Sequence, residues 1–234
     1  MKCIGLLGGM SAASTQLYYA ELIRLAAGQG GLHSPNLLIR SLDFAAIAEM
    51  QAHGDWPALG RLLKAEAQAM EAGGAELLVL ATNTMHKLAE EMCEGVQLPF
   101  IHIADATAAA IRAAGLNRPG LMGTSFTMEQ DFYTGRLSAA GLQPVLPNAD
   151  DRAEVHRVIY EELCRNDIRE ESRASYIAIA ERLAEYGADC LILGCTEVGL
   201  LLNETNVPVP VFDTTLLHCE AAYAAALAPS PGAG

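Results

Sequence analysis

The fold of this chain is decided by residues 75–86, which read AELLVLATNTMH. The apolar run at residues 77–81 is short and unbroken, which is typical of a strand buried inside a parallel sheet. It ends abruptly at Thr82, Asn83 and Thr84, three small polar residues. In open α/β sheets, ligands bind beyond the carboxyl ends of the strands. We therefore expect these three side chains, called here the first tip, to lie at a ligand site.

The same order of parts occurs a second time. Residues 188–197 read ADCLILGCTE, and aligning Ala188 with Ala75 gives a shift of 113 positions. In this alignment Cys195 falls on Thr82, and the two residues that follow each of them also correspond. We call residues 195–197 the second tip. Each half of the chain thus presents a strand end with a proton-carrying side chain, and we expect the two tips to face one substrate.

The rest of the chain follows the same duplicated pattern. Each half alternates strands and helices, and residues 120–125 echo residues 5–10. Such alternation indicates parallel strands with right-handed crossovers. The sequence therefore predicts an α/β fold of two pseudo-symmetric parallel-sheet domains, with the active site in the cleft between them. The expected elements include strands at 98–103 and 142–146 and helices at 85–91 and 127–137.

Charge and composition exclude several classes of protein. The 234 residues carry a formal net charge of −13, which argues against nucleic acid and anionic membranes as partners. No apolar run is long enough to span a bilayer, and the apolar start is too short and glycine-rich for a signal peptide. Six cysteines occur without disulfide or zinc-ligand spacing, which fits a reducing compartment and predicts no metal. We expect a cytoplasmic protein that binds a small molecule.

Two glycines, Gly8 and Gly9, follow the first predicted strand and precede a helix. Glycine lets the backbone approach a ligand closely, and free amides at a helix N-terminus favour an anion. The alternative is a tight turn with no ligand. Both interpretations stay open on the sequence alone.

His86 and Arg40 also have two interpretations each. A lone histidine beside a strand end is usually a surface or helix-capping residue. Next to Thr82, His86 could instead orient or polarise a hydroxyl that must lose its proton. Arg40 could line a pocket, although a surface position is the simpler expectation.

Two facing tips suit one reaction in particular, the inversion of a stereocentre by proton transfer. One group removes the Cα proton from one face, and its counterpart delivers a proton to the other. A thiol with an ordinary pKa of about 8.5 can be tuned for this work by its neighbours. The carbanion next to a carboxylate needs fixed donors, and the sequence contains no cofactor motif to share that load. The available donors are Asn83, Thr84, Thr124 and Thr196.

Three motifs together resemble the aspartate/glutamate racemase family. They are GGMS at residues 8–11, ATNTMHK at 81–87 and GCTE at 194–197. Three further stretches, at residues 102–107, 128–133 and 210–214, are similar to its broad-specificity amino-acid racemase branch. The resemblance covers essentially the whole chain. It implies a cofactor-independent racemase, commonly a homodimer, with residues 1–103 and 212–234 in one domain and residues 104–211 in the other.

The first tip departs from the family pattern, which is usually Cys-Asn-Thr. Thr82 replaces the cysteine, and a hydroxyl is a far weaker acid than a thiol. The broad-specificity branch carries threonine here, so the resemblance implies proton transfer between Cys195 and Thr82. It also implies that substrate contacts come from Met10, Gln51, Asn83, Thr84, Thr124 and Thr196.

Gln51 stands near the position where aspartate-specific relatives use a cation for the side-chain carboxylate. A neutral amide there predicts a weaker preference for acidic substrates and a broader range of amino acids. Two alternatives remain. Relatives resembling arylmalonate decarboxylase need only one cysteine, which here would be Cys195. A non-catalytic amino-acid binder would explain Thr82 as lost chemistry.

Overall fold

The computed structural model describes residues 1–229, and the chain forms two compact units. The first unit contains Met1–His102 together with the segment that starts at His218. The second unit is Ile103–Leu217. The chain thus leaves the first unit after His102 and returns to it within its last helix.

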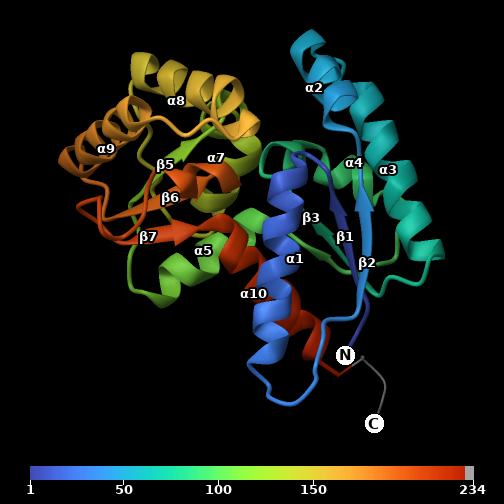
Figure 1. The fold of residues 1–234 in the computed structure, drawn as a ribbon. Helices are drawn as coiled ribbons and strands as arrows, with labels where there is room; N and C mark the ends of the chain where they lie inside the picture. Colours follow the sequence, from blue (N-terminus) through green and yellow to red (C-terminus); the bar gives the residue numbers. More distant parts are fainter. Residues whose placement is uncertain (230–234) are drawn as a thin grey trace. The chain divides into compact units, whose positions relative to one another are not determined.

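The first unit is built on a four-stranded parallel sheet with the order β2-β1-β3-β4. The strands are β1 (Ile4–Gly8), β2 (Leu37–Ser41), β3 (Leu77–Leu80) and β4 (Phe100–Ile101). The helices are α1 (Ala12–Ala27), α2 (Phe44–His53), α3 (Trp56–Ala72), the 3-10 helix η1 (Thr84–Leu88), α4 (Ala89–Cys93) and, from His218 on, α10 (Thr214–Leu227). Figure 1 shows α1 and α3 beside this sheet.

Alternation along β3 explains why this apolar run must lie inside the sheet. Leu78 and Leu80 pack in the core that contains residues of α2 and α3. Leu77 and Val79 pack in the core shared with α1 and α10. All four side chains are at most 1% exposed, because successive residues of a strand point to opposite faces and both faces are covered by helices.

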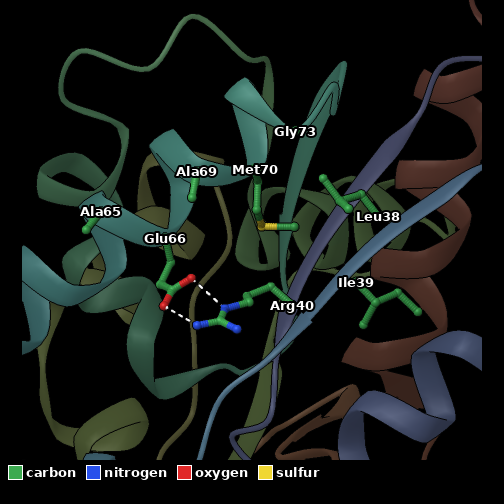
Figure 2. A pocket seen from close by; sticks show the side chains of 8 residues that line it. All are labelled: Leu38, Ile39, Arg40, Ala65, Glu66, Ala69, Met70 and Gly73. Carbon is green, nitrogen blue, oxygen red and sulfur yellow. Dashed lines mark hydrogen bonds and ion pairs between the residues drawn. The ribbon is translucent and has the colours of Figure 1, made fainter.

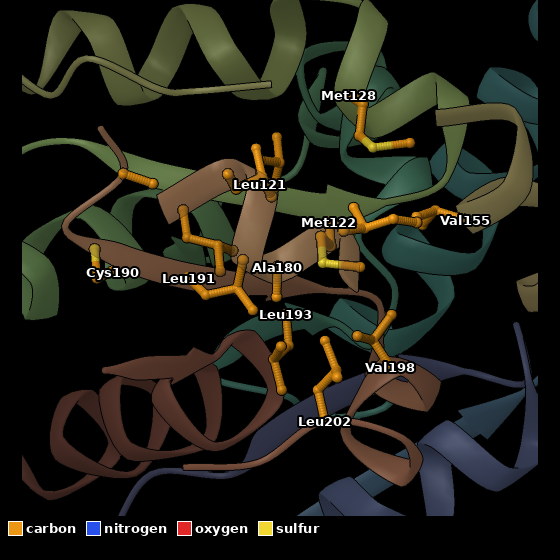
Figure 3. Packing of buried hydrophobic residues seen from close by; sticks show 14 of the residues in the cluster. Leu121, Met122, Met128, Val155, Ala180, Cys190, Leu191, Leu193, Val198 and Leu202 are labelled. Atoms are coloured by element: carbon orange, nitrogen blue, oxygen red, sulfur yellow. The ribbon is translucent and has the colours of Figure 1, made fainter. Parts of the chain in front are cut away.

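The second unit has a three-stranded parallel sheet with the order β5-β6-β7. Its strands are β5 (Pro119–Gly123), β6 (Cys190–Gly194) and β7 (Val211–Asp213). Its helices are α5 (Ile103–Ala113), α6 (Ser125–Glu129), α7 (Asp131–Ala139), α8 (Ala149–Glu161), η2 (Leu163–Arg165), α9 (Glu170–Glu185) and η3 (Thr196–Leu200). Figure 3 shows how Leu121 and Met122 of β5 and Leu191 and Leu193 of β6 pack in its apolar core.

The predicted α/β class with two parallel sheets is confirmed, while several element boundaries differ. The strand expected at residues 142–146 is reduced to one bridge, between Val145 and Gly120. The amides of Gln143 and Val145 still donate to the Asn117 and Pro119 carbonyls, at 2.7 and 2.8 Å. The next donor on this side would be Pro147, which has no backbone N–H. The strand expected at 98–103 is shortened to Phe100–Ile101, because α5 already begins at Ile103.

Two predicted helices are also interrupted. The helix expected at 127–137 divides into α6 and α7, since Gln130 has an extended backbone with φ −109° and ψ 147°. The helix expected at 85–91 starts as the 3-10 helix η1 and becomes α-helical at Ala89. Within residues 1–229, no helix has both the length and the apolar character needed to cross a bilayer.

Candidate active site

The first tip lies at the carboxyl end of β3, as the sequence predicts. The last ladder bond beyond β3 runs from the Ala81 amide to the Leu7 carbonyl at 2.8 Å, and the Thr82 amide then turns back to the Leu80 carbonyl at 2.9 Å. Thr82, Asn83 and Thr84 are 8%, 5% and 6% exposed, respectively. Across residues 1–229, the Thr82 hydroxyl makes no hydrogen bond, which leaves it available to a substrate.

The glycine turn after β1 lies beside this tip in the neighbouring strand. Gly9 has a φ of +89°, and a Cβ placed on it would lie 2.2 Å from the Leu42 amide nitrogen. Its own N–H donates to Thr15 Oγ1 at 2.7 Å. Packing and an internal hydrogen bond therefore account for Gly9, which supports the tight-turn interpretation. Ser11 caps α1 by accepting from the Ser14 amide at 3.2 Å.

Met10 and Gln51 approach the first tip from other elements of the first unit. Met10 is 6% exposed and belongs to the core that also contains Met85 of η1. Gln51, on α2, is 6% exposed and donates from Nε2 to the Met85 sulfur at 3.1 Å. A buried, neutral amide therefore lies against Met85, the residue that follows the first tip.

Arg40 is not part of the predicted site. Its guanidinium donates to both carboxylate oxygens of Glu66, at 2.7 and 2.9 Å. Figure 2 shows this pair in a surface pocket beside Leu38, Met70 and Gly73. The Arg40 side chain is 56% exposed, and the simpler expectation of a surface position is confirmed.

The second tip lies at the carboxyl end of β6, and the sheet register brings Thr124 beside it. Gly123 of β5 pairs with Gly194 of β6, so the residues that follow, Thr124 and Cys195, occupy neighbouring strand ends. A Cβ on Gly123 would lie 2.9 Å from the Gly194 carbonyl oxygen, which explains the small residue beneath the site. Thr124 also caps α6 by accepting from the Thr127 amide at 3.3 Å.

Glu197 organises the second tip. The Cys195 thiol donates to Glu197 Oε2 at 2.9 Å, and the Thr196 hydroxyl donates to the same oxygen at 2.5 Å. Burial raises the pKa of Cys195 well above its usual value, and the charge of Glu197 raises this pKa further. The resting group is therefore a protonated thiol, held on a carboxylate that can accept its proton.

The sequence places Glu197 in the second tip without indicating its role, and it does not single out Cys164. Glu197 carries a signal that could have been used, because it follows Cys195 by two residues at a repeated strand end. Cys164, on η2, has no such signal. Burial raises its pKa to about 12, with Glu197 as the second cause.

The expected surface or helix-capping position of His86 is wrong, because the side chain is only 2% exposed. Its Nδ1 lies 2.7 Å from the Thr82 carbonyl oxygen, so it contacts the backbone of the first tip. His102 and His218, which the sequence left outside the site, are also buried and lie against His86. Among the side chains of residues 1–229, no three His, Cys, Asp or Glu are grouped as a metal site would require.

The predicted site residues therefore form two groups, one in each unit. The first contains Met10, Gln51, Thr82, Asn83 and Thr84, and the second contains Thr124, Cys195 and Thr196. Each group gathers beyond the carboxyl ends of adjacent parallel strands, β1 and β3 in one unit and β5 and β6 in the other. A partly buried thiol beside a carboxylate can exchange protons with a substrate, and so can a hydroxyl group at a strand end.

Comparison with known proteins identifies relatives along nearly the whole chain. The family model of the Asp/Glu/hydantoin racemases matches residues 7–222. The broad-specificity amino-acid racemase RacX of Bacillus subtilis (strain 168) is 23% identical over 216 residues, which cover 91% of this chain and 92% of RacX.

Solved structures extend the comparison to the fold. A crystal structure from Yersinia pestis, assigned to an Asp/Glu racemase, is 45% identical with a TM-score of 0.91 and covers 97% of this chain and all of its own (100%). An aspartate racemase homologue from Pyrococcus horikoshii OT3 is 32% identical with a TM-score of 0.84, covering 97% and 99% of the two chains. Unliganded arylmalonate decarboxylase shares only the fold, at 14% identity and a TM-score of 0.52, with 98% and 95% of the two chains covered. The match of the family model across both units confirms the resemblance carried by the motifs, and the chain belongs to the Asp/Glu/hydantoin racemase family.

Proposed function

We propose that this protein is a cofactor-independent amino-acid racemase that inverts Cα by proton transfer between Cys195 and Thr82. The observation that carries the proposal is the Cys195–Glu197 hydrogen bond of 2.9 Å at a strand end. The internal repeat gives this strand end a counterpart at Thr82. The two tips are proposed to meet opposite faces of one bound amino acid.

Each proton has a defined destination in this mechanism. Glu197 accepts the thiol proton of Cys195, and the resulting thiolate removes the Cα proton of the substrate. The electron pair of the broken C–H bond moves into the substrate carboxylate, where hydroxyl and amide donors stabilise the added charge. Thr82 Oγ1 delivers its proton to the opposite face of Cα. Cys195 now carries the former Cα proton, Glu197 releases the proton it accepted to solvent water, and the Thr82 alkoxide takes a proton from solvent water, which restores the starting state. The reverse direction uses the same groups in the opposite order.

The donors around the two tips suit an amino-acid carboxylate. Asn83 and Thr84 start η1, and Thr124 and Thr196 stand at the ends of β5 and β6. With Met10 as a wall and Gln51 as a neutral amide, the site has no cation among its proposed contacts to hold an acidic side chain. We therefore propose a broad range that includes aspartate, glutamate and uncharged substrates such as homoserine.

The test is proton NMR in D2O with a panel of separate L-amino acids, combined with chiral chromatography. We expect loss of the Cα–H signal together with appearance of the D-enantiomer for at least one member of the panel. Exchange without inversion would contradict the two-sided mechanism. Absence of exchange and inversion on every amino acid would contradict the proposed function.

A second candidate function rests on the single thiol of the two tips. A decarboxylase acting on substituted malonates needs one proton donor, and Cys195 would supply it while Thr82 took no part. The repeat and the family match favour the racemase. Release of CO2 from phenylmalonate, without exchange of any amino-acid Cα–H, would favour the decarboxylase over the racemase.

Glu197→Gln is expected to lower racemisation about 10²- to 10³-fold, because the thiol loses its proton acceptor. The pKa of Cys195 should fall in the same variant, since a negative neighbour that raises it is removed. Lower activity together with a lower thiol pKa is the expected combination. Chiral chromatography measures the first and the pH dependence of iodoacetamide alkylation the second, with the exposed Glu204→Gln as control. An unchanged rate would show that Glu197 only packs against the thiol.

The family resemblance also leads us to propose a homodimer that works in the cytoplasm on a small-molecule substrate, without nucleic acid or membrane partners. Light scattering of the purified protein tests the oligomeric state, and cell fractionation tests the compartment.

A further inference from the structure

Three histidines gather in the interior of the first unit, and the proposed mechanism uses none of them. His86, His102 and His218 are 2%, 5% and 0% exposed. The ring centroid of His86 lies 4.5 Å from that of His102 and 5.6 Å from that of His218. Phe100 adds a fourth ring at 5.4 Å from His86. Burial disfavours the charged form of an imidazole, most strongly at His218, which is fully buried.

The hydrogen bonds of His218 fix its tautomer. Its Nε2 lies 2.7 Å from the Ile101 carbonyl oxygen, which can only accept, so Nε2 carries the proton. Its Nδ1 lies 2.8 Å from the Tyr18 hydroxyl, which therefore donates. Burial lowers the pKa of His218 to about 4, in agreement with a neutral ring. Both ring nitrogens of His218 are thus hydrogen-bonded, which fixes the orientation of the ring that packs against His86.

The same reasoning assigns the tautomer of His86. Its Nδ1 lies 2.7 Å from the Thr82 carbonyl oxygen, which can only accept, so Nδ1 carries a proton. The His86 amide also donates to the Asn83 carbonyl at 3.1 Å. Side chain and backbone of one residue therefore hold two successive carbonyls of the first tip.

These contacts matter because the first tip lies beyond the sheet ladder. After Ala81, the chain leaves the regular bonding of β3, and the Thr82 amide turns back to Leu80. The Thr82 carbonyl is held by the imidazole of His86. Threonine is branched at Cβ, so the backbone restricts the rotamers that its hydroxyl can adopt. An imidazole that fixes this carbonyl therefore fixes the backbone from which Oγ1 projects.

We propose that His86 is a positioning residue, which holds the Thr82 hydroxyl in line for proton transfer through the hydrogen bond from Nδ1 to the Thr82 carbonyl. The rings of Phe100, His102 and His218 keep its imidazole in place. This inference rests on the proposed function, because it gives Thr82 a proton to transfer. Loss of the His86 contact should therefore impair proton transfer at Thr82 and not at Cys195. Cys195 belongs to the other unit, where its thiol is hydrogen-bonded to Glu197.

The experiment follows Cα–H exchange in D2O for D- and L-aspartate separately, or for the homoserine pair if the wild type converts it faster. Thr82→Val identifies the enantiomer whose Cα–H faces Thr82. His86→Leu is expected to slow exchange of that same enantiomer about 100-fold, the size of effect that a displacement of about 1 Å can cause. Exchange of the other enantiomer and both KM values should stay within about threefold, which a general loss of structure would not allow.

Two further variants complete the design. His86→Asn keeps an N–H group near the place of Nδ1, and it should recover exchange to within about tenfold of the wild type, consistent with a role in orientation. His33→Leu makes the same replacement at an exposed histidine and should match the wild type. Thermal unfolding of each variant shows which of them are folded at the assay temperature.

The outcomes separate this proposal from the one it rests on. A wild type that exchanges no Cα–H contradicts the proposed function itself. A wild type that racemises, with His86→Leu losing both enantiomers equally or neither, overturns the positioning role alone. Nitrogen-15 NMR of the imidazoles gives an independent reading, because a His86 ring protonated on Nε2 and not on Nδ1 would also overturn it.

Discussion

Replacing Cys195 by alanine is expected to lower racemisation by at least about 10³-fold, while the protein stays folded. The thiol is the proposed acid and base on its face of the substrate, and alanine has no proton to exchange. Since racemisation in either direction must pass both tips, conversion of D to L should fall as far as conversion of L to D. Chiral chromatography from each pure enantiomer measures both directions.

The fold should tolerate this change for a structural reason. Cys195 is partly buried and lies beyond the end of β6, so it takes no part in the Gly123–Gly194 pairing. Cys93→Ala, at a partly buried thiol at the end of α4, is the matched control and should keep wild-type activity. Full activity in Cys195→Ala, beside a normal control, would end the two-sided mechanism.

Thr82→Val is the second large effect, with an expected loss of racemisation of about 10²- to 10³-fold. Valine has nearly the shape of threonine but no hydroxyl, so packing at the first tip should be preserved. In D2O the variant should still exchange the Cα–H that faces Cys195, without inverting the amino acid. This outcome separates loss of one proton-transfer group from loss of substrate binding.

Two replacements at the same position act as controls. Thr82→Ser keeps the hydroxyl and should retain activity within about tenfold, since the proton carrier is still present. Thr82→Cys restores the pattern usual for the family and should keep or raise activity on aspartate. If Thr82→Val were active and Thr82→Cys brought no gain, Thr82 would be only a wall of the pocket.

Much of the architecture could be predicted because its causes are local. The run at residues 77–81 is unbroken because both faces of β3 are covered, and the two cores on either side show this directly. The repeat at a shift of 113 positions predicted that Cys195 and Thr82 would take equivalent places. The register agrees, because both residues stand just beyond the paired ends of parallel strands.

The predicted element boundaries were wrong where strand pairing or backbone conformation decided whether a strand or helix continues. The segment around Val145 has an apolar pattern, yet only a single bridge forms, because Pro147 has no N–H to continue the pairing. The segment at 127–137 has helical spacing, yet the extended backbone at Gln130 divides it in two. Periodicity describes which side chains prefer burial, and it does not count the hydrogen bonds available to the backbone.

The sequence by itself determined the fold class, the two strand ends and which side chains stand there. These follow from short apolar runs, small polar residues after them, and the repetition of both. Only the tertiary structure decided how those groups are tuned. The Cys195 thiol donates a hydrogen bond to Glu197 because the chain enters η3 directly after Cys195. Burial raises the pKa of this thiol. His86 meets His102 and His218 because β4 and α10 bring distant residues to one interior, and burial of this kind depends on neighbours that no local pattern contains.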